Sequence, residues 1–159
     1  MTPIYLTDRI VDLGLGALKH HQEVVLPFIT ANLPAPPSSE RSVTWATLQL
    51  RFHRRAGHST AALQLLALVP GSILTLPYHR GGDNLEAARS LRRAAPEAEQ
   101  RNRIITAERR LEPDSFRPFI GTPLVIIDDA FWLSDTLTYD GLTDIMSAVS
   151  PDTFFLLLG

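Results

Sequence analysis

The sequence contains no cysteine, and this absence excludes two kinds of site. A chain without thiols forms no disulfide bond and no thiolate metal centre. Long apolar runs are absent too, since none approaches the roughly 20 residues that a membrane-spanning helix needs. The N-terminus shows no signal-peptide pattern. We therefore expect an intracellular protein with no membrane partner.

The sequence also has little net charge, and it is nearly free of lysine. The formal net charge is −2, and Lys19 is the sole lysine among 15 basic residues. A value so close to zero gives no general attraction to nucleic acid or to an anionic membrane. The arginine bias is typical of a GC-rich genome. It also means that arginine is the cation with which this chain would meet a phosphate.

The chain of 159 residues has the length of one domain, and a segment rich in proline and serine divides it into three parts. Residues 1–33 have helical apolar spacing, with Thr7 as the expected N-cap, and Pro27 is expected to break or kink the helix. Residues 34–40 are rich in proline and serine and predict a linker. The first 33 residues are thus predicted to form a helical appendage, which packs on the flank of the domain at 41–159 or on another subunit.

Strand-like and helix-like segments alternate through residues 41–159. Four apolar runs predict strands, at about 45–52, 72–78, 124–128 and 153–158. Three segments predict helices, at about 61–68, 84–111 and 140–149, the second with a break at Pro96. This alternation predicts an α/β fold with a parallel sheet of about four strands and flanking helices. Strands as apolar as 153–158 are expected to be buried on both faces.

Residues 54–60, Arg-Arg-Ala-Gly-His-Ser-Thr, lie between the first expected strand and the helix after it. In a phosphate-binding loop of the form Gly-x-x-x-x-Gly-Lys-[Ser/Thr], backbone N–H groups cradle the phosphates, the lysine reaches them, and the hydroxyl binds Mg²⁺. When Gly57 is aligned with the second glycine, His58 takes the lysine position and Ser59 takes the hydroxyl position. Phe52 stands where the first glycine should be.

The candidate ligand-binding residues are accordingly Arg54, Arg55, Ala56, Gly57, His58, Ser59 and Thr60. Arg54 and Arg55 would supply the cationic contacts that the missing lysine cannot. The alternative is an ordinary strand–turn–helix connection in which Ser59 or Thr60 is the N-cap.

The strand expected at 124–128 ends in two acids, Asp128 and Asp129. Carboxylates at the carboxyl end of a parallel strand lie at the edge where α/β proteins bind ligands. In a nucleotide site Asp128 would hold Mg²⁺ together with Ser59, and Asp129 would be the catalytic base that orients the attacking water. The alternative is that two acids merely terminate a buried strand.

The run Asp128-Asp129-Ala130-Phe131 resembles the Asp-Glu-Ala-x box of helicases, and Phe154 to Gly159 resembles the strand that follows that box. Together with the loop, these segments make residues 43–159 resemble the P-loop NTPase superfamily, in its helicase/terminase-like branch. Short phage-encoded members with Gly-His-[Ser/Thr]-Thr at the loop look most similar. The resemblance implies a viral protein, in the host cytoplasm or in a virion, that binds ATP or another nucleoside triphosphate with Mg²⁺.

Other residues have simpler interpretations. The five histidines show no metal-ligand spacing beside an acid cluster, so a metal site built on them is a minor alternative. The arginine-rich stretch at 80–117 also carries many acids, so a solvated helix face is the default and a nucleic-acid surface the alternative.

The sequence therefore predicts a nucleotide-binding protein with weak or absent ATPase activity. One alternative is a degenerate scaffold that binds a protein or nucleic-acid partner without nucleotide. A second is a partial motor subunit that acts with partner chains. Self-association or protein binding through residues 1–33 would fit each of them.

Overall fold

The computed structural model describes residues 3–32, 45–51, 57–76, 83–106, 121–128, 149–150 and 152–159. Its strands are β1 (Thr47–Leu50), β2 (Ile73–Leu76), β3 (Ile104–Thr106), β4 (Leu124–Ile127) and β5 (Phe154–Leu158). They form one sheet in the order β1-β5-β4-β2-β3, and each neighbouring pair is parallel. The α/β fold with a parallel sheet is confirmed, and each of the four predicted strands lies within its predicted range.

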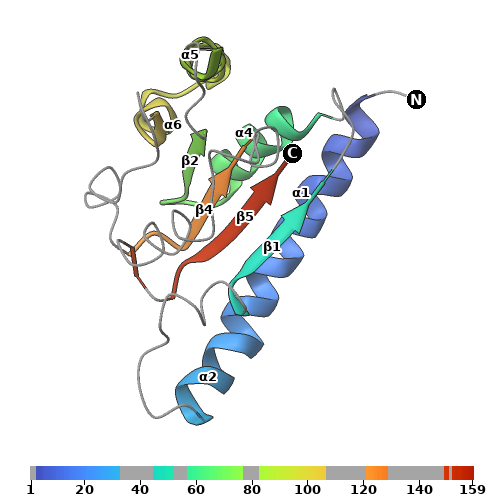
Figure 1. Ribbon diagram of the computed structural model, residues 1–159, viewed down its shortest axis with the longest axis vertical. Coiled ribbons are helices and arrows are strands. Elements are labelled where there is room, and N and C mark those ends of the chain that lie inside the picture. Colours follow the sequence, from blue (N-terminus) through green and yellow to red (C-terminus); the bar gives the residue numbers. More distant parts are fainter. Residues whose placement is uncertain are drawn as a thin grey trace.

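The described helices are α1 (Pro3–His20), the π-helical turn η1 (His21–Val25), α2 (Leu26–Asn32), α4 (His58–Leu68), α5 (Asp83–Ala94) and α6 (Ala98–Asn102). Figure 1 shows α1 and α2 as one long rod that runs beside β1, with α4 next to α1 and with α5 and α6 beyond β2. The helix predicted at 140–149 and the linker at 34–40 lie outside the described residues. The division into an appendage, a linker and a core domain therefore stays a prediction.

The helix predicted at 84–111 is wrong in its second half. Helix α5 ends at Ala94, the short helix α6 follows Pro96, and β3 then adds a fifth strand at the sheet edge. The three residues of β3 are Ile104, Ile105 and Thr106, which are all β-branched. A strand of three residues is difficult to recognise in the sequence, because the charged residues around it favour a helix.

Of the two effects expected at Pro27, a break does not occur, because the helix continues through it as α2, but a π-helical turn distorts the helix just before it. The π-turn η1 ends at Val25, two residues before this proline, and Leu26 N–H donates to the carbonyl of His21, five residues back. In a regular helix the proline ring would clash with the carbonyl of Glu23. The wider turn gives the ring room, and the helix proceeds as α2.

Alternation along the strands divides the buried side chains between the two faces of the sheet. The even-numbered residues of β2, β4 and β5 face the helices and join one hydrophobic core with Ile10, Leu65 and Leu91. The odd-numbered residues Ile73, Val125 and Phe155 are equally buried but face the other way. The expectation that these apolar strands are buried on both faces is confirmed.

Gly14 lets α1 approach the sheet closely. A Cβ atom at this position would lie 3.1 Å from a side-chain carbon of Leu65 in α4 and 3.1 Å from one of Leu156 in β5. Gly16, on the same helix, has nothing within 4 Å of such an atom. Helix α1 thus contributes buried residues, Ile10, Val11 and Leu18, to the main core.

Replacing Gly14 by valine should lower the free energy of unfolding by about 1–3 kcal/mol, because extra carbon atoms must enter a filled core. Gly16→Ala is the matched control, and it should raise the free energy of unfolding by up to about 1 kcal/mol through helix propensity alone. Urea denaturation of both variants measures the difference. A stable Gly14→Val variant would show that α1 does not pack as described.

Candidate functional site

The carboxyl ends of all five strands lie at one edge of the sheet, because the strands are parallel. The chain leaves β2 toward β3 on one side and leaves β4 toward β5 on the other. Connections that diverge between neighbouring strands mark the place where open α/β sheets bind ligands. Leu76 ends β2 and Asp128 follows β4, so these two residues lie at the divergence.

Asp128 reaches this place because β4 continues its pairing for one more residue. Its backbone N–H donates to the carbonyl of Thr75 at 3.0 Å, which holds it beside β2. As an even-numbered residue it points to the same face as Leu124 and Ile126, toward the helices. Its side chain is buried, with the residue 0% exposed.

The N-terminus of α4 comes to the same edge. Gly57 is its N-cap and has φ = 87°, the left-handed region that favours glycine. Because the N-cap is Gly57, which has no side chain to cap the helix, the alternative in which Ser59 or Thr60 is the N-cap is wrong. The helix begins at His58, and the first N–H groups of an α-helix have no partner within it. These groups and the helix dipole favour an anion at this end.

Thr7 supports this turn from α1. It was expected to cap a helix, but α1 begins at Pro3 and Thr7 lies inside it. Its hydroxyl donates to the carbonyl of Gly57 at 3.3 Å, and Ala61 N–H donates to the same carbonyl at 2.9 Å. A threonine inside a helix has no sequence signal that would reveal such a contact.

The contact that joins the two motifs is between His58 and Asp128. His58 Nδ1 lies 2.6 Å from Asp128 Oδ1, a short hydrogen bond in which the imidazole N–H donates to the carboxylate. The two residues are 70 positions apart in the sequence, and His58 is 8% exposed. The side chain that stands in the lysine position is therefore in direct contact with the acid predicted to hold the metal.

A pocket of about 340 Å³ lies beside this pair. Its described lining consists of Ser59, Thr60, Leu63, Leu76, Ala87, Ser90, Leu91, Ala94 and Asp128. The walls are mostly aliphatic, the hydroxyls come from the helices, and Asp128 is the charged residue in this set. Of the predicted ligand-binding residues, Ser59, Thr60 and Asp128 are thus brought together.

The wall of the pocket that α5 forms was not predicted from the sequence. Ala87, Ser90, Leu91 and Ala94 have the spacing of one helix face. Small residues at this spacing, within a helix otherwise rich in arginine and glutamate, were the available signal. Arg54, Arg55, Ala56 and Asp129 lie outside the described residues, so their predicted roles stay predictions.

The other buried histidine has a structural role. His21 Nε2 bonds with the carbonyl of Asp152 at 3.1 Å, and its ring packs on Phe154 with centroids 5.2 Å apart. Burial lowers the pKa of His21, although the carbonyl and the negative charge of Asp152 act in the opposite direction. Within the described ranges, no three histidine or acidic side chains gather to hold a metal ion.

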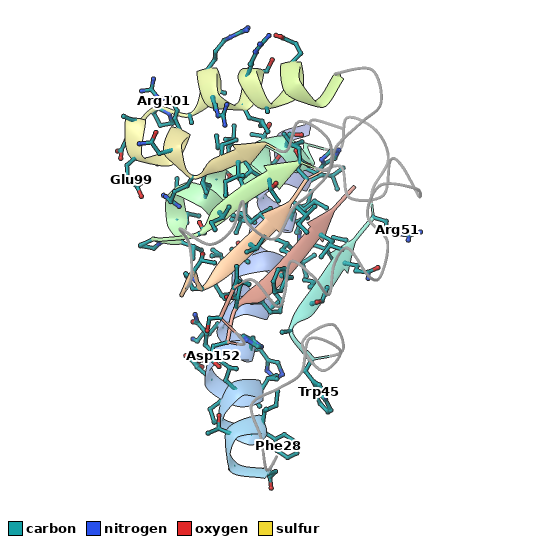
Figure 2. The ribbon with its side chains drawn as sticks, turned by 60° about the vertical axis from the view of Figure 1, so that its left-hand side comes forward. Phe28, Trp45, Arg51, Glu99, Arg101 and Asp152 are labelled. Atoms are coloured by element: carbon teal, nitrogen blue, oxygen red, sulfur yellow. The ribbon has the colours of Figure 1, made fainter. Side chains whose placement is uncertain are left out.

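Arginines of the charge-rich stretch also have structural partners. Arg92 donates to the carbonyl of Ile104 from Nε at 3.2 Å and from Nη2 at 2.7 Å, which ties α5 to β3. Arg103 Nη1 donates to the Ser72 carbonyl at 2.7 Å, and its Nε lies 2.6 Å from Glu99 Oε1. Figure 2 shows Arg101 and Glu99 on the outer side of α6. The solvated-face interpretation therefore does not apply to Arg103, which is buried.

No family model, curated protein or solved structure matches this chain. Among the described helices, none has both the length and the apolar character required to cross a bilayer.

Proposed function

We propose that this chain binds a nucleoside triphosphate at the edge of the sheet between α4 and β4, with weak or absent hydrolysis. The observation that carries the proposal is the 2.6 Å contact between His58 and Asp128. It brings together the two segments that resemble the phosphate loop and the metal-binding strand of P-loop NTPases. Neither segment predicts a nucleotide site by itself, but their meeting at one sheet edge supports it.

Three further features support a ligand here, and the first of them favours an anion. The N-terminus of α4 offers backbone N–H groups, and Gly57 supplies the left-handed turn before them. The pocket lies at the divergence of the strand connections, which favours ligand binding. Its volume of about 340 Å³ falls at the lower end of the range for small-molecule sites.

The predicted metal, Mg²⁺, fits these residues in kind. Ser59 and Asp128 line the same pocket and offer a hydroxyl and a carboxylate, the oxygen ligands that Mg²⁺ prefers. Asp128 Oδ1, however, is already hydrogen-bonded to His58. When bound, Mg²⁺ would neutralise phosphate charge. This chain's own residues would hold the phosphates through the α4 N-terminus and, as predicted, through Arg54 and Arg55.

Calorimetry of ATP binding with Mg²⁺ tests the proposal. We expect weak binding to the wild-type chain and a loss of about 1.5–3 kcal/mol in Arg55→Ala, the range for a charged hydrogen bond. Arg101→Ala is the matched control, because Arg101 is exposed on α6 and bonds to the carbonyls of Pro96 and Glu97. It should bind ATP as the wild type does. Equal losses in both variants would contradict a phosphate role for Arg55.

Two observations favour the scaffold alternative. His58 is hydrogen-bonded to Asp128, and the pocket walls are largely aliphatic. In this alternative the chain would bind a protein or nucleic-acid partner on its surface, and no nucleotide would bind at the sheet edge between α4 and β4. Failure of the wild-type chain to bind ATP, ADP or GTP in the same calorimetry would favour this alternative.

A further inference from the structure

The imidazole of His58 lies on the carboxylate that is predicted to hold the metal, and we propose that this contact is autoinhibitory. His58 competes with a divalent cation for Oδ1 of Asp128, so that the metal gains this oxygen only when the imidazole moves away. The inference rests on the proposed function, because it concerns the regulation of that same site.

The geometry favours a firm contact. The atoms are 2.6 Å apart, and both residues are shielded from water, with His58 8% and Asp128 0% exposed. Hydrogen bonds to an ionised carboxylate are stronger than neutral ones, and a low local dielectric strengthens them further. A cation that binds Asp128 Oδ1 must therefore displace a well-made hydrogen bond.

The backbone around His58 is fixed, so the competition is decided by the side chain. Helix α4 is anchored by Ala61, Leu65 and Leu66, which are buried in the core. The carbonyl of Gly57 accepts hydrogen bonds from Thr7 and Ala61, which hold the turn before His58. On the other side, the pairing of Asp128 N–H with the Thr75 carbonyl fixes the acid.

The pocket gives a cation its route to the acid. It is lined by Asp128 and by the hydroxyl residues Ser59 and Thr60, and it is partly open to solvent because Thr60 is exposed. An ion entering it meets Asp128 with Oδ1 already engaged. The apparent affinity for the cation is then the intrinsic affinity multiplied by the fraction of molecules in which His58 has moved away.

The size of this reduction follows from the strength of the hydrogen bond. A hydrogen bond to a charged group corresponds to a roughly 10- to 100-fold change in an equilibrium constant. We therefore expect removal of the imidazole to raise the affinity for a divalent cation by about that factor.

Titration with Mn²⁺ alone, followed by electron paramagnetic resonance, tests the inference without any nucleotide. His58→Ala should bind Mn²⁺ at least about 10-fold more tightly than the wild type, and the double variant His58→Ala/Asp128→Asn should lose that gain. His58→Leu, which fills the buried space with an apolar side chain, should show the same gain if His58→Ala folds poorly. His21→Gln, which replaces the other buried histidine, is the control and should resemble the wild type.

Two outcomes would overturn the inference. In the first, the wild type binds Mn²⁺ as tightly as the folded His58 variants do. In the second, none of the folded variants binds Mn²⁺ at millimolar concentration. Absence of ATP binding is a separate result that would reject the proposed nucleotide while leaving the Mn²⁺ comparison intact.

Discussion

Replacing Arg103 by leucine should lower the free energy of unfolding by about 3 kcal/mol. Arg103 is 7% exposed, and its Nη1 donates to the Ser72 carbonyl at 2.7 Å and to the Ser72 hydroxyl at 3.1 Å. Leucine would leave these buried acceptors without their donor. Glu99 would lose its partner at little cost, because its side chain is 65% exposed and would be solvated by water.

Arg101→Leu is the matched control, since Arg101 lies in α6, two residues before the C-cap residue Arg103, and is exposed. Its replacement should change the free energy of unfolding by less than about 0.5 kcal/mol. Urea denaturation followed by circular dichroism compares the two variants. If they unfold at the same midpoint, the buried network around Ser72 does not stabilise the fold.

Arg103 also illustrates where sequence reasoning stops. Arginines and acids are mixed throughout residues 80–117, so nothing local distinguishes Arg103 from Arg101. The distinction arises because the chain turns from α6 into β3, and β3 pairs with β2. That pairing buries Arg103 against Ser72, 31 residues away.

The fold itself was largely predictable, because the apolar runs of β2, β4 and β5 are local signals. Their lengths and their nearly continuous apolar character, interrupted only by Thr75 in β2, predict strands buried on both faces. The order of the strands was not predictable, because it depends on contacts between distant segments. The placement of β5 between β1 and β4 has no signal in any one segment.

The candidate site was predictable to the same extent. A parallel sheet brings the ends of its strands to one edge, so the meeting of Asp128 with the start of α4 follows from the fold. The direct contact between His58 and Asp128 does not follow, because it depends on side-chain direction at both ends. The contributions of Thr7 and of the α5 wall depend on how α1 and α5 pack.

His58→Lys should strengthen ATP binding in the presence of Mg²⁺ by about 10-fold or more, the equivalent of one charged hydrogen bond. Lysine carries a compact charge on a flexible stem of four carbons, whereas the imidazole is short and its Nδ1 is held at Asp128. A lysine at position 58 would restore the cation that phosphate loops use to reach the β- and γ-phosphates.

Gln64→Lys is the matched control, because it adds the same charge to an exposed position of α4 away from its N-terminus. Calorimetry should show ATP binding to Gln64→Lys at the wild-type affinity and tighter binding to His58→Lys. Equal gains in both variants would indicate a general effect of charge. If ATP binds to neither the wild type nor His58→Lys, the nucleotide proposal fails. The alternative then holds, in which the fold is a scaffold that binds a protein or nucleic-acid partner without nucleotide.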